Sequence, residues 1–255
     1  MRMFLATVGL VMSTGAYSQV MGGEIDYTSA GTICQGYLAK DLNKAGKRPG
    51  ILIIHDWNGV DGYEEGRAVQ LAKLGYVALC ADIYGKGVRP KNAQESGAQA
   101  GKYKSNRTLY RERLQSALDE LKKDPNVDPN RVVAIGYCFG GTGVLEMARA
   151  GMAVKGVVSF HGGLDADPNM MAGTVTSKVL VLNGGDDQSA TPEKVAALQK
   201  EFAGASMEIV AYPGAVHAFT VPTAGNDPSK GVAYNKDADE KSWAKMKTFF
   251  ATLFK

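Results

Sequence analysis

A cysteine flanked by glycines is the residue whose chemistry stands out first. Cys138 lies in the sequence GYCFG at 136–140, where an apolar run ends and a helix-like pattern begins at once. A G-x-C-x-G sequence at such a junction is typical of a nucleophile elbow, with sulfur in place of a hydroxyl oxygen. The helix expected from Phe139 favours a thiolate through its free N–H groups and dipole. Cys138 is therefore either a nucleophile or a small hydrophobic residue ending a core strand.

Two further side chains complete a candidate triad. Asp186 and Asp187 follow one expected strand and His217 follows the next, which is the chain order of the α/β-hydrolase fold. In that arrangement His217 is the general base, and an aspartate fixes its tautomer and stabilises the imidazolium. An acid after a strand is ordinarily a turn former or helix cap. The triad hypothesis therefore depends on the chain order of the three residues and on their common position after strands.

Alternating strands and helices must bring these groups together. Continuous apolar runs such as Pro49–Asp56 suit strands that are covered on both faces. The pattern predicts a mostly parallel, doubly wound sheet with helices on both faces and ligand chemistry at the strands' carboxyl ends. A long polar connection at 86–106 is expected to be a lid with a short helix. Strands are expected at 31–39, 49–56, 76–85, 131–138, 154–162, 177–187 and 206–214, and helices at 63–75, 109–124, 139–150, 192–203 and 239–254.

Composition limits the classes of partner. The 255 residues are 45% hydrophobic and 22% charged, which suits one domain with a sizeable core. The net charge is only +3, and no Lys/Arg run is interleaved with aromatics, so nucleic acid is not an expected partner. The histidine and cysteine spacings match no metal-ligand set, and no phosphate-cradling glycine loop occurs. We expect neither a metal nor another cofactor.

The N-terminus has the pattern of a secretory signal. Arg2 precedes an apolar stretch at 4–12, and small residues at Ala16 and Ser18 suit cleavage after Ser18. The stretch is too short to span a bilayer as a helix, and the alternative is a short buried helix. The sequence thus predicts a leader at 1–18 and one mature domain at 19–255, secreted or periplasmic and free of the membrane.

Three cysteines cannot all pair within one chain. Cys34 and Cys80 lie in apolar, strand-like segments, so we expect buried free thiols there rather than a bridge.

The sequence resembles the dienelactone hydrolase family over nearly all of the expected mature chain. The similar segments run from IHDWNGVDGYEEG through ADIYGKG at 54–87, with GYCFGG at 136–141, GGDDQS at 184–189 and GAVHAF at 214–219. The cysteine elbow is the specific part, because ordinary members of the fold use serine. The resemblance implies a triad of Cys138, Asp187 and His217. Asp187 is preferred because the family's acid stands three residues after the first glycine of GGxD.

The resemblance also implies an acid near the thiol and an oxyanion hole. Asp56 occupies a position where the family usually has glutamate, and the backbone N–H groups of Trp57 and Phe139 correspond to the oxyanion donors. A carboxylate disfavours a nearby thiolate, so Asp56 would act as a hydrogen-bond partner or proton acceptor that exchanges with His217. The alternative role for Asp56 is a loop cap.

The expected substrate is a small ester or lactone whose acid part is undefined. Family members hold a substrate carboxylate with arginines, one of them four residues after the histidine, where this chain has Val221. Arg89 is a candidate for positive charge beside the pocket, although loop cations are usually only solvated. Tyr84 and His161 are further pocket candidates, with core-rim and structural roles as the alternatives.

These observations predict a monomeric hydrolase that works through a cysteine acyl-enzyme without cofactor. Two alternatives remain: a catalytically silent member of the fold that binds a ligand, and a redox-active thiol protein. The second lacks a resolving cysteine close to Cys138 in the sequence.

Overall fold

A computed structural model describes residues 19–170 and 173–255 of the chain. The expected leader at 1–18 lies outside these residues, so the signal peptide and the secreted or periplasmic location stay predictions. These residues include eight strands: β1 (Val20–Ser29), β2 (Thr32–Asp41), β3 (Arg48–Ile54), β4 (Val77–Ala81), β5 (Val127–Tyr137), β6 (Gly156–Phe160), β7 (Lys178–Gly184) and β8 (Met207–Tyr212). The helices are α1 (Gly62–Lys73), α2 (Ala93–Lys104), α3 (Arg107–Lys123), α4 (Phe139–Arg149), α5 (Pro192–Glu201) and α6 (Lys236–Leu253).

One sheet runs through the molecule in the order β1-β2-β4-β3-β5-β6-β7-β8. The pairs from β4 to β8 are parallel, whereas β2 pairs antiparallel with both β1 and β4. The expected mostly parallel, doubly wound sheet is confirmed. β4 and β6 are buried at every position, as their unbroken apolar runs predict for strands covered on both faces.

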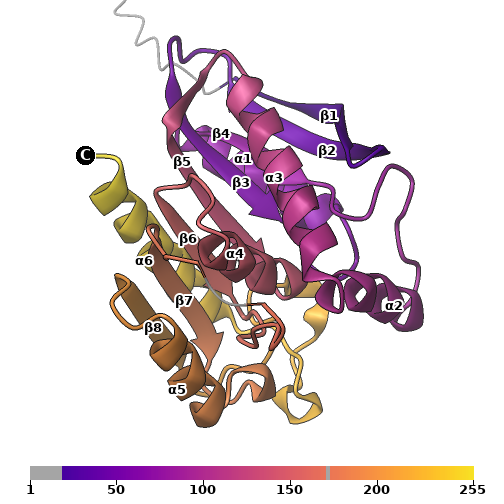
Figure 1. The fold of residues 1–255 in the computed structure, drawn as a ribbon, viewed down its shortest axis with the longest axis vertical. Coiled ribbons are helices and arrows are strands. Elements are labelled where there is room, and N and C mark those ends of the chain that lie inside the picture. Colours follow the sequence, from indigo (N-terminus) through magenta and orange to yellow (C-terminus); the bar gives the residue numbers. More distant parts are fainter. Residues whose placement is uncertain (1–18, 171–172) are drawn as a thin grey trace, which may run out of the picture.

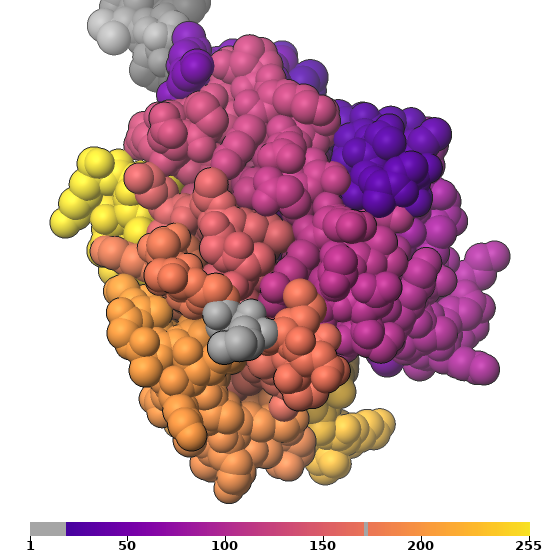
Figure 2. Space-filling model, viewed as in Figure 1, coloured from indigo at the N-terminus to yellow at the C-terminus, as the bar shows by residue number. Residues whose placement is uncertain are grey.

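Helices cover both faces of this sheet. α3, α4 and α5 pack on the face toward the viewer in Figure 1, and α1 and α6 pack behind it. Figure 2 shows the front face as a continuous surface in which the helices and their side chains hide the strands. The two layers enclose separate apolar clusters, one on each side of the sheet. Because β3 to β8 are parallel, their carboxyl ends lie at the same edge of the sheet. The loops at that edge can hold catalytic side chains.

The connection expected to be a lid contains a full helix, α2. Asn92 caps it by accepting a hydrogen bond from the backbone N–H of Glu95. Ser96 on α2 donates to Asn58 Oδ1 at 3.0 Å, which ties the helix to the loop after β3. The expected short helix is present, whereas its motion as a lid stays a prediction.

All three cysteines are free thiols in the described structure. Cys34 and Cys80 are buried free thiols, as predicted, and Cys138 is a free thiol of intermediate exposure. No helix within residues 19–170 and 173–255 combines the length and apolar character needed to cross a membrane.

Candidate active site

The turn between β5 and α4 holds Cys138 in a strained backbone conformation. Its φ of 51° lies in the left-handed region that non-glycine residues rarely adopt. The neighbouring glycines make this turn possible: a Cβ on Gly136 would lie 2.0 Å from Gly140 O, and one on Gly140 would lie 2.1 Å from Ile54 O. Both contacts are with backbone and cannot be relieved by a rotamer change. The G-x-C-x-G spacing is therefore a steric requirement of this turn.

A buried hydrogen-bond chain supports the turn from behind. Cys138 N donates to Phe160 O at 3.0 Å and to His161 Nδ1 at 3.1 Å. Because His161 Nδ1 accepts, its Nε2–H donates to Thr220 Oγ1 at 2.7 Å, and Thr220 Oγ1 lies 2.6 Å from Tyr63 OH. Burial keeps the pKa of His161 well below its usual value, so the ring is neutral. His161 is 0% exposed; it lies within this buried chain and not at an open pocket mouth.

His217 and Asp187 form the second part of the site. His217 Nδ1 lies 3.0 Å from Asp187 Oδ2, and Asp187 Oδ1 accepts from Ser189 N at 2.7 Å. Burial raises the pKa of Asp187, but its hydrogen bonds with His217 and Ser189 bring it below the usual value. Asp186 is exposed, and its backbone N–H donates to Ala215 O. The structure thus pairs Asp187, not its neighbour, with His217.

The charge state of His217 links it to the thiol. Burial alone would lower the pKa of the imidazole, but its hydrogen-bonding and electrostatic interactions with Asp187 and Cys138 outweigh burial and raise it to about 10. The ring therefore interacts with a carboxylate on one side and with the Cys138 sulfur on the other. The three residues of the candidate triad come together from the ends of β5, β7 and β8. This arrangement can move a proton between sulfur and nitrogen.

The backbone N–H groups of Trp57 and Phe139 are the expected oxyanion donors. Within the described residues, neither Trp57 N nor Phe139 N donates a hydrogen bond to a protein acceptor. Phe139 is the first residue of α4, whose initial N–H groups have no intrahelical acceptors. A tyrosine holds the carbonyl of each residue: Tyr84 OH donates to Trp57 O at 3.1 Å, and Tyr110 OH donates to Phe139 O at 2.9 Å.

Tyr84 is therefore a positioning residue in this structure. Its side chain is 3% exposed and its hydroxyl is occupied by the Trp57 carbonyl. This matches the core-rim alternative more closely than a substrate contact. Sequence reasoning missed Tyr110, which lies 29 residues from Phe139 in the chain.

Asp56 follows β3 and is turned toward its own loop. Its Oδ1 accepts from Asn58 N at 2.7 Å and its Oδ2 from Asn58 Nδ2 at 3.2 Å. In the described structure neither oxygen is hydrogen-bonded to the Cys138 thiol. Burial raises the pKa of Asp56 to about 6, although the hydrogen bonds from Asn58 oppose the shift. These contacts match the alternative role for Asp56, that of a loop cap. Its carboxylate changes charge near neutral pH, because its pKa is about 6.

Glu64 on α1 organises the same loop and was missed by sequence reasoning. Its fully buried carboxylate accepts from Asp56 N at 3.0 Å and from Asp61 N at 3.4 Å. Burial and the neighbouring Asp56 and Asp61 charges raise the pKa of Glu64 well above its usual value. Asp61 and Glu64 form a capping box for α1, and the D-x-x-E spacing was the signal that could have identified it.

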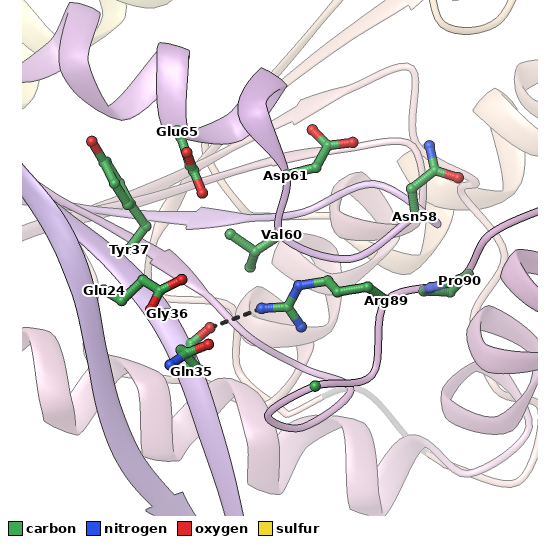
Figure 3. A pocket seen from close by; sticks show the side chains of 11 residues that line it. Glu24, Gln35, Gly36, Tyr37, Asn58, Val60, Asp61, Glu65, Arg89 and Pro90 are labelled. Carbon is green, nitrogen blue, oxygen red and sulfur yellow. Dashed lines mark hydrogen bonds between the residues drawn. The ribbon is translucent and has the colours of Figure 1, made fainter.

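Arg89 lines a cavity of about 370 Å³ beside this loop (Figure 3). Its guanidinium donates to Val88 O and Gln35 O and lies 3.6 Å from Asp82. The cavity also exposes three carboxylates, so Arg89 is not an isolated positive clamp. The position four residues after His217 holds Val221, as in the sequence, and supplies no charge. The cavity is lined by Glu24, Gln35, Gly36, Tyr37, Asn58, Val60, Asp61, Glu65, Gly87, Arg89 and Pro90.

His55 is held by contacts with its own loop and with the segment after β4. It is fully buried, its Nδ1 pairs with Asp56 O, and its Nε2 accepts from Ile83 N. Burial lowers its pKa to about 4. Across the described part of the chain, no group of three or more His, Cys, Asp or Glu side chains is arranged to hold a metal ion.

Comparison with known proteins places this geometry in context. A family model described as the dienelactone hydrolase family matches residues 34–254. A solved dienelactone hydrolase-like promiscuous phosphotriesterase from metagenomic libraries is 36% identical, with a TM-score of 0.86 and coverage of 92% of this chain and 98% of its own. A Synechocystis protein named "Putative carboxymethylenebutenolidase" is 26% identical over 86% of this chain and 92% of its own. A Bradyrhizobium protein named "Probable 2-oxo-3-(5-oxofuran-2-ylidene)propanoate lactonase" is 27% identical over 76% and 82%.

Proposed function

The chain belongs to the dienelactone hydrolase family, and on that premise we propose that it hydrolyses a small ester or lactone through a triad of Cys138, His217 and Asp187. Its hydrolase class follows from the family. The proposed triad is supported chiefly by the contacts of His217, whose Nδ1 is 3.0 Å from Asp187 Oδ2 and whose pKa is raised by interaction with Cys138 as well as Asp187. A histidine bridging a carboxylate and an elbow thiol is the arrangement that activates a sulfur nucleophile.

The proposed reaction has two halves. With the thiol proton already held by His217, the sulfur attacks the carbonyl carbon, and the ester C–O bond then breaks as His217 gives that proton to the leaving oxygen. The resulting thioester is attacked by a water that His217 deprotonates. Cleavage of the C–S bond releases the acid, and the proton taken from water stays on His217 beside the free sulfur. With a lactone, the acid and the alcohol remain in one product.

The free N–H groups of Trp57 and Phe139 would stabilise the oxyanion in both halves. Donors held in place before the reaction stabilise developing charge without a reorganisation cost. The tyrosine contacts to the carbonyls of these two residues support that role, because they fix the orientation of both segments. Asp56 and Glu64 act through the loop that carries Trp57, as positioning residues.

Phosphotriester cleavage is a second candidate reaction. The observation that favours it is the 36% identity to a promiscuous phosphotriesterase over 92% of this chain. The same thiolate would attack phosphorus and expel an aryloxide, with the phosphoryl oxygen held by the two N–H groups. Turnover of paraoxon that depends on Cys138 would support it, and no turnover above the Cys138→Ala background would contradict it.

The test compares the parent with Cys138→Ala and Cys138→Ser on p-nitrophenyl esters and small enol lactones. We expect kcat/KM to fall by about 10³-fold or more in both variants, as for the loss of a nucleophile. Mass spectrometry of the quenched parent should find the acyl group on the peptide that contains Cys138.

An exposed-residue variant, Asp186→Asn, serves as the control and should retain activity. Ester turnover that persists in Cys138→Ala would overturn the proposal. Reversible oxidation of Cys138 by peroxide without any ester turnover would instead support a redox protein. An inert thiol with no turnover would support a silent, ligand-binding member of the fold.

A further inference from the structure

A second cavity lies at the opposite edge of the sheet from Cys138. Its volume is about 550 Å³, and it opens between the start of β3, the turn after α1 and the end of α6. The cavity is lined by Lys44, Ala45, Arg48, Pro49, Leu74, Gly75, Tyr76, Arg131, Phe250, Ala251 and Phe254. Nothing in the proposed reaction uses these residues.

The charged lining of this cavity is entirely basic. Lys44, Arg48 and Arg131 contribute cations, and no carboxylate belongs to the described lining. The ammonium of Lys44 reaches over Gly75, where an added Cβ would meet it at 2.7 Å. Within the described residues, Lys44 has no carboxylate within salt-bridge distance. The cavity therefore has a surplus of positive charge that favours an anion.

Arg48 is the buried member of this set. It is 7% exposed, its Nη1 donates to Asp41 O at 2.9 Å, and its Nε has no hydrogen-bond partner among the described residues. An unpaired buried donor on a charged group is costly. Because the residue lines the cavity and its guanidinium has no carboxylate within salt-bridge distance among the described residues, its charge adds to the attraction for an anion there.

Aromatic side chains form the apolar part of the same cavity. The Tyr76 ring packs against Phe250 and Phe254 with centroids 5.6 and 5.8 Å apart. Phe250 is 0% exposed, so it forms the floor, while Tyr76 and Phe254 are half-buried at the sides. The Arg131 guanidinium lies over Phe254, 5.7 Å from the ring centroid. A ligand here meets flat apolar surface beside cationic donors.

We propose that this cavity is a binding site for an aromatic carboxylate. The carboxylate is bound by Lys44 and Arg131, the buried charge of Arg48 adds to their attraction, and the ring packs against Tyr76 and Phe254. Guanidinium and ammonium donors suit a carboxylate, and the aromatic walls distinguish a ring-bearing acid from a small inorganic anion.

The site is remote from the candidate active site. Arg48 begins β3 and Asp56 follows its end, and at about 3.3 Å per strand residue the eight-residue separation corresponds to about 26 Å. Binding here is therefore independent of the proposed function, and it can be measured with the active-site thiol blocked.

The experiment is calorimetric titration of the full chain, alkylated at Cys138, with 2-naphthoate, 2-naphthamide and inorganic phosphate. Lys44→Gln and Arg131→Gln test the site, and Arg48 is left intact because its buried contacts support the fold. Lys47→Gln is the matched control, since Lys47 is exposed, adjacent in sequence and absent from the lining. Circular dichroism verifies that each variant is folded.

We expect 2-naphthoate to bind with one-to-one stoichiometry, and each site variant to weaken it by about 5-fold or more, the loss of one charged hydrogen-bond partner. Lys47→Gln should leave the affinity within about 2-fold of the parent, and both other probes should bind more weakly. Absence of 2-naphthoate binding, or equal affinity in the parent and both site variants, would overturn the proposal. Equal binding of phosphate or 2-naphthamide would overturn the aromatic carboxylate as the ligand class.

Discussion

Burial affects the carboxylates of Asp187 and Asp56 with different results. Asp187 is buried, yet hydrogen bonds from His217 and Ser189 hold its pKa below the usual value, so it is ionised at neutral pH. Asp56 is also buried, but among the described residues only Asn58 donates hydrogen bonds to it, and burial raises its pKa to about 6. One acid can therefore keep His217 protonated, while the other changes charge near neutral pH.

Replacing Asp187 by Asn should remove the charge that stabilises imidazolium at His217. The pKa of His217 should then fall from about 10 toward its ordinary value. We expect kcat to fall by about 10²–10⁴-fold, as when the acid of a triad is replaced. Steady-state kinetics and the pH dependence of Cys138 alkylation measure both effects. Asp186→Asn is the matched control, and an equal loss in that variant would contradict the assignment.

Asp56→Asn should change how stability depends on pH. The folded pKa is raised from 3.8 to about 6, so this group's contribution is present below pH 3.8 and is lost as pH rises through about 6. The shift corresponds to about 3 kcal/mol of unfolding free energy. The variant should therefore gain about 2–3 kcal/mol relative to the parent between about pH 4 and pH 8.

Urea unfolding at the two pH values measures this difference. Exposed Asp186→Asn should show no such gain. If Asp56→Asn and the parent differ equally at both pH values, Asp56 does not carry the raised pKa.

At the scale of elements, the turn that carries Cys138 is held by segments from three parts of the chain. His161 follows β6, Thr220 lies in the loop after β8, and Tyr63 belongs to α1. Thr220 Oγ1 lies 2.7 Å from His161 Nε2 and 2.6 Å from Tyr63 OH. Movement of β6, of α1 or of the loop after β8 would be transmitted to Cys138 N through these hydrogen bonds. The hydrogen-bond chain therefore couples the Cys138 turn to the loop that carries His217.

Thr220→Val should disturb that coupling without changing the side-chain shape. It leaves His161 Nε2–H without its acceptor, which costs about 1–3 kcal/mol for the unsatisfied group, and it removes the contact with Tyr63 OH. In conditions where the variant stays folded, we expect slower Cys138 alkylation and a lower kcat. Thr220→Ser keeps the hydroxyl and should restore both. If Thr220→Val destabilises the protein but leaves the rate of Cys138 alkylation unchanged, Thr220 has only a structural role.

The strands that sequence predicts best are those whose environment is uniform. β4 is buried throughout, so its apolar run is unambiguous. β1 was not predicted, because most of Val20–Ser29 is exposed and its GGE segment has little strand propensity. It forms by pairing along the whole of β2, a long-range property that local pattern does not record.

At the scale of the whole molecule, the sequence predicted the chain order of the candidate triad but not the hydrogen-bond partners of the buried side chains. The chain order of Cys138, Asp187 and His217 was readable because parallel strands end at one edge. The roles of Tyr84 and His161 were not, because their partners, Trp57 O and Thr220 Oγ1, are 27 and 59 residues away. Which polar atom a buried side chain reaches depends on packing between elements, and one sequence contains no direct signal of it.

The three thiols offer a test of the whole fold, because they differ in what must open before they react. Cys34 in β2 and Cys80 in β4 are 0% exposed, and burial raises the pKa of Cys34 to about 11 and that of Cys80 well above its usual value. A disulfide reagent should therefore modify one thiol quickly in the native protein and all three in denaturant, and Cys138→Ala should remove the fast one. The remaining two should react only through global opening, with rates that rise with urea as steeply as unfolding itself. Two or more fast native thiols would mean that the central strands are not covered as described, since adjacent strands under two helix layers cannot expose a thiol without opening the core.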